Sequence, residues 1–177
     1  MIRAFQFIIS LGKPPPDVSW ITSTLAVGGS PVPRQFAGLA QIGIQAVVDL
    51  REEARDDEGL LVEHGIRLLH LPVRDHWPPS QSQLLHGTDW VLGQLAAGRK
   101  TLLHCKNGVG RSIVLGCCVL MRQGYDLARA VHLVKARRWG VALNRRQMSA
   151  LKQFGASLNV CSPQVPGEPK DTRRPSP

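Results

Sequence analysis

The stretch KTLLHCKNGVGRSIVLGCCVLM, residues 100–121, predicts a strand, a tight loop and a helix in that order. KTLLHC is typical of a short buried strand, and the apolar run that follows Arg111 is typical of a buried helix. Between Cys105 and Arg111 lie five residues, and Gly108 and Gly110 among them can adopt positive φ, so the loop can curl tightly. Loop N–H groups and the helix dipole would then form an anion site from backbone alone.

Strand-like and helix-like segments alternate around this stretch. We expect further strands at 20–29, where the strand runs into a glycine turn, at 44–50 and at 66–73. We expect helices at 33–43, 52–65, 81–98, 126–138 and 145–158, and Ser80 with Gln83 forms a capping box before the third of them. This order predicts an α/β fold with a central, mostly parallel sheet flanked by helices.

Length and composition indicate one folded domain. The chain has 177 residues, of which 43% are hydrophobic, enough for a sizeable core. We expect an N-terminal arm at 1–17, the folded domain at 18–160 and a disordered, proline-rich tail at 161–177. The apolar run at 4–11 is too short to span a bilayer and lacks a small-residue cleavage site, so it predicts a short strand or docking arm, with an organelle-targeting role left open.

The cysteines and the net charge narrow the possible classes of protein. Cysteines stand at 105, 117, 118 and 161 without regular spacing, which predicts neither a disulfide framework nor a zinc site, and favours a reduced, cytoplasmic protein. We expect no metal and no cofactor. The net charge of +9 would attract phosphorylated proteins, anionic lipids or nucleic acid, although it could equally belong to a solubilising surface.

Cys105 is the candidate nucleophile. A thiol at a helix N-terminus beside positive charge has a lowered pKa, and its thiolate is the reactive form. Arg111 offers a planar fork that matches two phosphate oxygens, Ser112 can donate a hydrogen bond to the sulfur, and the ring of His104 would orient the loop. The alternative is a buried structural thiol beside a glycine turn. For the neighbouring pair at 117 and 118, within an apolar run, we expect a place in the core.

Asp75 is the candidate general acid. It lies in RDHWPPS, residues 74–80, directly after a predicted strand. Because the carboxyl ends of parallel strands share one edge of a sheet, we expect Asp75 to meet Cys105 there. Asp56, Asp57 and Asp89 are rivals, but they lie on predicted helices. The alternative for Asp75 is a solvated turn residue.

These segments together resemble a known family. HCKNGVGRS, residues 104–112, matches the HCxxxxxR(S/T) signature of the cysteine-dependent protein phosphatases. With VVDLR, LPVRDHWPPS and RRWGVALNRRQM, the chain resembles the small atypical dual-specificity phosphatases over about residues 20–158. The resemblance implies a protein tyrosine phosphatase-like fold, with 18–160 as the catalytic domain.

The resemblance also implies a two-step mechanism. Cys105 attacks phosphorus while Asp75 protonates the leaving oxygen, and Asp75 then activates the water that releases phosphate from the cysteine. Ser112 assists the departing sulfur. The substrate phosphate would be bound by Lys106, Asn107, Gly108, Val109, Gly110 and Arg111. His104 and Asn144 would support the loop, although Leu143 stands where the family often has a proline before the asparagine.

The sequence is compatible with three functions. The first is a protein phosphatase for phosphotyrosine and phosphoserine/threonine, since the chain is too short for the pocket-deepening loop of the tyrosine-specific enzymes. The second is a phosphatase for phosphoinositides or another phosphate monoester; lipid-directed members tend to have two basic loop residues, and this loop has Lys106 but Val109 at the second place. The third is a non-catalytic phosphate-binding module.

The expected partners follow from these readings. We expect a phosphoprotein substrate, or else an anionic lipid or other phosphate monoester, with no nucleic acid and no membrane span, and a monomeric protein. The basic runs KARRWG and NRRQ, at 135–140 and 144–147, could recognise acidic substrates or could be solvated faces. Trp77 could line the pocket rim or be an ordinary surface aromatic.

Overall fold

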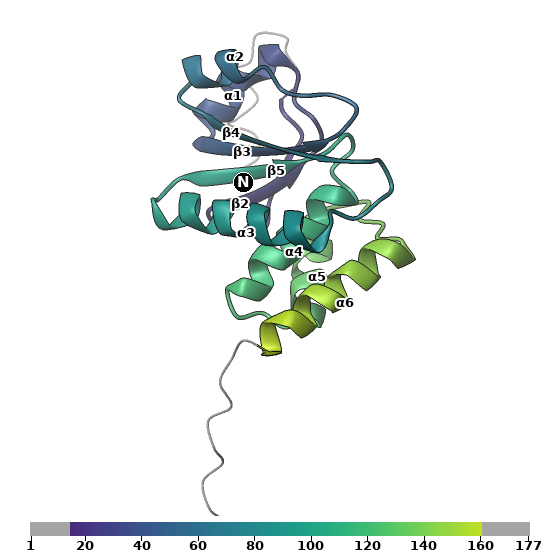
Figure 1. Cartoon of the computed structure of the whole chain (residues 1–177). Coiled ribbons are helices and arrows are strands. Elements are labelled where there is room, and N and C mark those ends of the chain that lie inside the picture. The colour runs from purple at the N-terminus through teal and green to yellow at the C-terminus, as the bar shows by residue number, and fades with distance from the viewer. Residues whose placement is uncertain (1–14, 161–177) are drawn as a thin grey trace, which may run out of the picture.

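The computed structural model describes residues 15–160 and shows a sheet between two layers of helices. The parts of the predicted arm and tail at 1–14 and 161–177 lie outside the described residues. Helices α1 (Phe36–Gln41) and α2 (Glu58–Glu63) cover one face of the sheet. The other face carries four longer helices (Figure 1): α3 (Gln81–Ala96), α4 (Arg111–Arg122), α5 (Leu127–Arg137) and α6 (Arg145–Val160).

The sheet has five strands and is mostly parallel, as predicted. The strands are β1 (Val18–Trp20), β2 (Leu25–Gly28), β3 (Ile44–Arg51), β4 (Arg67–Val73) and β5 (Lys100–His104), in the spatial order β1-β2-β5-β3-β4. Only the β1–β2 pair is antiparallel within the described chain. In the centre, His104 aligns with Gly28 of β2 and with Asp49 of β3. The loop after β5 therefore begins between the ends of two neighbouring strands.

Helix α4 is the buried centre of the larger helical layer. Every residue from Arg111 to Met121 is buried, because the helix is covered by α3, α5, α6 and the sheet. Its apolar sequence on all sides is what such a position requires. Cys117 and Cys118 lie in this core, as expected. A second core, which includes Phe36, packs between the other face of the sheet and helices α1 and α2.

Two predicted elements differ from the structure. The strand expected at 20–29 is interrupted: Trp20 ends β1, and β2 begins only at Leu25 as the second strand of a hairpin. The Thr22 Oγ1 accepts hydrogen bonds from the backbone N–H groups of Thr24 and Leu25 in the turn between the two strands. The helix expected at 52–65 begins only at Glu58. Residues 52–57 are held outside the helix, where Asp56 bonds to β3 through its backbone N–H group.

The start of α3 confirms the predicted capping box. The Ser80 hydroxyl accepts a hydrogen bond from the Gln83 backbone, and the Gln83 side chain accepts one from the Ser80 backbone. This cap and the end of β4 at Val73 limit the loop that carries Asp75 to a short connection. Within residues 15–160, no helix combines the length and apolarity needed to cross a bilayer.

Candidate active site

Most of the predicted site residues line one cavity of about 390 Å³. His104, Gly108 and Ser112 are buried and do not line it. Its lining includes Cys105 and Arg111 at the two ends of the loop after β5, and Asp75 from the loop after β4. We call residues 105–110 the cysteine loop and residues 74–79 the aspartate loop. Asn144 and Gln147, at the start of α6, close the remaining side. The expectation that Asp75 and Cys105 meet at one sheet edge agrees with this placement.

The cysteine loop depends on glycine at position 108. Gly108 has φ of +66°, in the left-handed region, and a Cβ atom there would collide with the backbone carbonyl of Gly28. The Ser30 backbone N–H donates to the carbonyl of Lys106 at 3.1 Å. The loop is thus packed directly onto the end of β2, with no room for a side chain between them.

Arg138 holds the outer side of the cysteine loop. Its guanidinium donates to the carbonyls of Gly108 (3.1 Å) and Asn107 (2.9 Å), and pairs with both carboxylate oxygens of Asp17 (2.6 and 2.7 Å). Since each peptide is planar and trans, carbonyls turned toward Arg138 direct the following N–H groups to the opposite side of the loop. Sequence reasoning missed this role, because nothing in KARRWG distinguishes the buried Arg138 from the exposed Arg137, and Asp17 ends the expected arm.

Cys105 has the environment of a thiolate. Burial raises the pKa of its thiol, but hydrogen bonds from the Ser112 hydroxyl and from the Ser112 and Gly108 backbone, together with the charge of Arg111, bring that pKa below the ordinary value. The Cys105 Sγ lies 3.5 Å from the Ser112 Oγ. By contrast, burial raises the pKa of the Cys117 thiol to about 12, and that of Cys118 is raised as well. Of the three described cysteines, Cys105 is therefore the one whose thiol pKa is lowered rather than raised.

Arg111 is oriented by Glu53. The Nη1 and Nη2 atoms of Arg111 donate to the two carboxylate oxygens of Glu53 at 2.7 and 2.8 Å, and Nη1 also donates to the carbonyl of Val73. The hydrogen bond from Arg111 lowers the pKa of the Glu53 carboxyl to about 2, so the pair is charged at neutral pH. The only sequence signal for Glu53 was its position just after β3, at the edge of the sheet where the site lies.

Asp75 lies against Arg111 in this structure. An Asp75 carboxylate oxygen is 3.0 Å from Nη2 of Arg111 and also accepts a hydrogen bond from the backbone of His76. The Asp75 side chain is about half exposed, at 49%. The arginine fork expected to receive phosphate is thus occupied by Glu53 and Asp75.

Asn144 joins α6 to the aspartate loop. Its side-chain amide donates to the carbonyl of His76 at 2.7 Å, and its side-chain oxygen accepts from the Gln147 backbone at 3.0 Å. The Gln147 side chain accepts a hydrogen bond from the Asn144 backbone in return. Asn144 therefore caps α6 and supports the aspartate loop rather than the cysteine loop, with Leu143 in the preceding position. His76 itself has φ of +62°, an uncommon conformation for a residue with a side chain.

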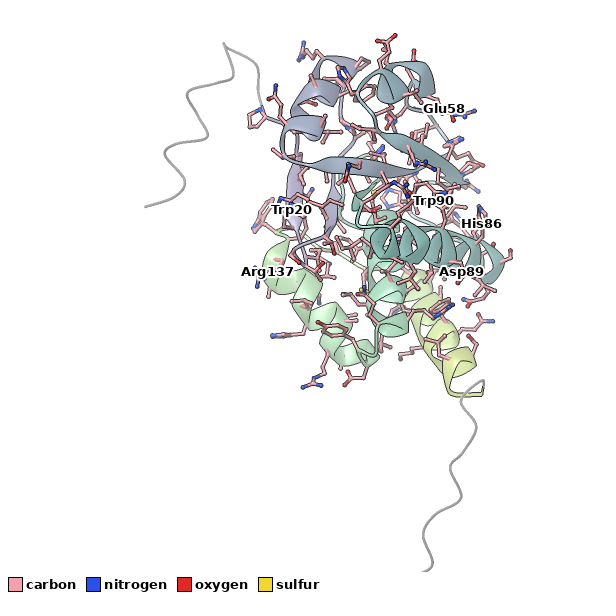
Figure 2. The ribbon with its side chains drawn as sticks, turned by 90° about the vertical axis from the view of Figure 1, so that its left-hand side faces the viewer. Trp20, Glu58, His86, Asp89, Trp90 and Arg137 are labelled. Atoms are coloured by element: carbon pink, nitrogen blue, oxygen red, sulfur yellow. The ribbon has the colours of Figure 1, made fainter. Side chains whose placement is uncertain are left out.

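The rival acids are used elsewhere. Asp56 falls within the helix predicted at 52–65, but in the structure it is buried before the start of α2, where it bonds to His104 and Arg51. Asp57 caps α2 by accepting from the Leu60 backbone. Asp89 lies on the outer side of α3, as Figure 2 shows, and pairs with Arg122 at 3.0 Å. None of the three lines the cavity.

His104 belongs to a buried ionic network behind the site. Its Nε2 is 2.8 Å from Asp56, whereas its Nδ1 has no hydrogen-bond partner among the described residues and lies 3.8 Å from Asp49. The ring thus bonds to the segment before α2, not to the cysteine loop as expected. The possible ligand atoms of His104, Asp49 and Asp56 are close enough together to hold a metal ion. However, the Arg51 guanidinium already donates hydrogen bonds to both carboxylates.

Comparisons with known proteins agree with this site. The family described as "Polymorphic toxin system, DSP-PTPase phosphatase" matches residues 24–125, more than half of the chain. Dual specificity phosphatase 28 of Homo sapiens is 29% identical over 159 residues, which cover 88% of this chain and 86% of that protein. Phosphatidylglycerophosphate phosphatase PTPMT2 of Arabidopsis thaliana is 26% identical over 138 residues, 76% of this chain. The chain spans 60% of PTPMT2 and 47% of its relative PTPMT1.

Solved structures show the same fold. The crystal structure of Tk-PTP in the active form is 30% identical, with a TM-score of 0.75 over 80% of this chain and 97% of that one. The crystal structure of human DUSP28 has a TM-score of 0.72, with 25% identity over 83% of this chain and 97% of that one. The family match and the signature loop in this fold lead to one conclusion. The chain belongs to the small atypical dual-specificity phosphatases of the cysteine-dependent protein tyrosine phosphatase superfamily.

Proposed function

We propose that the protein hydrolyses phosphate monoesters through a phosphocysteine formed on Cys105. The observation that carries this proposal is the stabilised thiolate of Cys105 in a cavity that it shares with Arg111 and Asp75. A non-catalytic module would have no need for a lowered thiol pKa facing an acidic side chain. The proposed catalytic domain spans 18–160, with Asp17 tied to it through Arg138.

The first step begins when the phosphate displaces Asp75 from Arg111. The phosphate oxygens accept from the cysteine-loop N–H groups, from Nε of Arg111 and from the Nη2 that Asp75 occupies. Glu53 keeps the guanidinium plane fixed during this exchange. Cys105 attacks phosphorus, the bond to the leaving oxygen breaks, and the protonated Asp75 gives its proton to that oxygen.

The second step releases phosphate. Asp75, now a carboxylate, takes a proton from a water molecule that attacks the phosphocysteine, and the bond between phosphorus and sulfur breaks. The Ser112 hydroxyl, 3.5 Å from the sulfur, stabilises the departing thiolate. Gln147 is buried at the cavity wall beside Gly110 and would hold the attacking water.

For the substrate we propose phosphotyrosine and phosphoserine/threonine in proteins. Support comes from the relative dual specificity phosphatase 28, which matches over nearly the whole length of both chains. A second candidate is a phospholipid or other non-protein monoester, favoured by the two Arabidopsis phosphatidylglycerophosphate phosphatases. Within the cysteine loop, Lys106 is the one lysine or arginine that lines the cavity, and Val109 stands where a second basic residue would be.

A panel of substrates tests the proposal. Phosphate release from a phosphotyrosine peptide, a phosphothreonine peptide, phosphatidylglycerophosphate vesicles and an aryl phosphate would be compared in the wild type and in Cys105→Ser. We expect the wild type to hydrolyse the peptides and the aryl phosphate, and Cys105→Ser to hydrolyse none. Cys117→Ser is the matched control and should retain activity, since Cys117 is buried in the core. Equal turnover by wild type and Cys105→Ser would remove Cys105 as nucleophile, and turnover of lipid alone would favour the second candidate.

A further inference from the structure

A second, larger cavity lies beside the active site. This groove has a volume of about 740 Å³ and runs between the aspartate loop and α6. Arg74 and Trp77 line the groove, whereas Asp75 and His76, between them in the chain, line the catalytic cavity. The aspartate loop is therefore the wall that separates the two spaces, and a substrate that crosses this loop can occupy both.

Two arginines of the groove are free to bind an anion. The guanidinium carbons of Arg146 and Arg74 lie over the ring of Trp77, at 4.3 and 5.8 Å from its centroid. Neither arginine forms an ion pair with a carboxylate within residues 15–160, unlike Arg111 and Arg138. A guanidinium that stacks on an aromatic ring keeps its in-plane N–H groups available, so the pair can still receive a carboxylate.

The rest of the groove combines apolar surface with free polar groups. Pro72, Pro78 and Trp77 supply accessible apolar surface. Ser149 and Gln153 are exposed, and their side chains make no hydrogen bond within the described chain. A lipid acyl chain would leave such polar groups unpaired, at a cost in free energy. A peptide offers backbone N–H and C=O groups to them and side chains to the proline and tryptophan surface.

We propose that this groove binds the segment of a phosphoprotein substrate next to the phosphorylated residue, with an acidic side chain held by Arg74 and Arg146. This inference rests on the proposed protein phosphatase activity. An extended peptide has a fixed rise per residue, so the acidic side chain lies at a fixed spacing in sequence from the phosphorylated residue. The basic NRRQ run thereby contributes to recognition through its second arginine, Arg146.

The test measures a preference ratio. Phosphotyrosine peptides of one length would carry a single Glu at each position from five before to five after the phosphotyrosine, each paired with a peptide carrying Gln there. In the wild type we expect kcat/KM to favour Glu over Gln by about three- to tenfold at one or two positions, and not elsewhere. Arg146→Gln and Arg74→Gln should each reduce this ratio toward one. Because the ratio compares two substrates of one variant, a change in the chemical step cancels.

Arg145→Gln is the matched control. It removes the same charge one residue away, from an exposed side chain that does not line the groove, and should keep the preference. Arg146→Glu should shift the preference at the same positions from Glu to Lys, which a variant that merely fails to fold cannot do. Three results would each overturn the inference. The wild type could show the same Glu/Gln ratio of kcat/KM at every position, or the positional preference could persist in both Arg74→Gln and Arg146→Gln. The preference could also be lost as fully in Arg145→Gln as in those two variants.

The same assay separates the two proposals. If the wild type hydrolyses peptides through Cys105 but shows no positional preference, the groove assignment fails and the proposed function stands. If peptides are not hydrolysed while phosphatidylglycerophosphate vesicles are, the protein substrate and the groove's peptide both fail. In that case a loss of lipid turnover in Arg146→Gln would assign the groove to the lipid.

Discussion

The two loops of the active site are built in opposite ways. In the cysteine loop and the helix that follows it, Cys105 and Arg111 are 3% and 2% exposed, and the backbone carbonyls are held by Arg138 and Ser30. In the aspartate loop, the side chain of Asp75 is 49% exposed, and that of His76 is 88% exposed. Within the described residues, the aspartate loop is held by polar and ring contacts from Arg111, Asn144 and Arg146, and by the burial of its last residue, Pro79.

This difference matches what each loop has to do. Stabilising charge on a phosphoryl group requires dipoles that are already oriented, because reorienting them during the reaction would cost free energy. A proton donor must instead leave Arg111, reach the leaving oxygen and later act as a base, which a half-exposed side chain can do. Substitutions in the cysteine loop should therefore slow the hydrolysis of every substrate. Substitutions in the aspartate loop should slow hydrolysis by an amount that depends on the leaving group.

Among variants that keep Cys105, the largest effect should come from Asp75→Asn. We expect it to slow phosphopeptide hydrolysis by about 10²- to 10⁴-fold, because an alkyl or phenolic leaving oxygen needs a proton in the transition state. An aryl phosphate with an acidic phenol should be slowed far less, and alkylation of Cys105 by iodoacetamide should stay unchanged. Steady-state kinetics over a series of leaving groups measures this difference. If Asp75→Asn slowed the hydrolysis of all leaving groups equally, another residue would be the general acid, and the proposed difference between the two loops would be wrong.

Gly108→Ala should have the next largest effect, on all substrates alike. The new Cβ would collide with the Gly28 carbonyl and displace the cysteine loop, and a displacement of about 1 Å can cost about 10²-fold in rate. Gly98→Ala is the control, because Gly98 also has positive φ (+75°) but open space around its Cβ position. Urea unfolding of both variants separates backbone strain, which they share, from the collision. Gly108→Ala with normal turnover would show that the loop is adaptable.

Ser112→Ala should have a smaller effect that depends on pH. The pKa of Cys105 is lowered in the folded protein, so its thiolate persists at pH values below the ordinary thiol range and is lost as pH falls through the lowered pKa. Removal of the Ser112 hydroxyl removes one hydrogen bond to the thiolate and raises that pKa. At pH values below the lowered pKa, where the rate follows the thiolate fraction, we expect iodoacetamide alkylation to slow by roughly tenfold, the equivalent of one charged hydrogen bond. The pH profile of alkylation measures the shift, and an unchanged profile would assign the lowering to the backbone N–H groups alone.

The sequence was most informative where the residues of the site are adjacent in the chain. Cys105, the glycines, Arg111 and Ser112 follow one another in the chain, so their spacing alone indicates an anion site with a nucleophile at its base. The alternation of strands and helices likewise predicted the mostly parallel sheet. Prediction was wrong where polar side chains form tertiary bonds: the helix expected at 52–65 loses its first turns because Asp56 bonds to β3 and His104 instead.

Residues 100–121 alone are therefore enough to predict the strand, loop and helix that place Cys105 and Arg111 at one anion site. The distant charges around this site depend instead on how the whole chain packs. Glu53 reaches Arg111 from 58 residues away, and Asp17 reaches Arg138 from 121 residues away. Short sequence patterns indicate only the periodicity of helices and strands and the positions of turns. Which arginine of an adjacent pair turns inward, and which glutamate meets it, depends on how the strand ends and helices pack, and is settled only when the chain is folded.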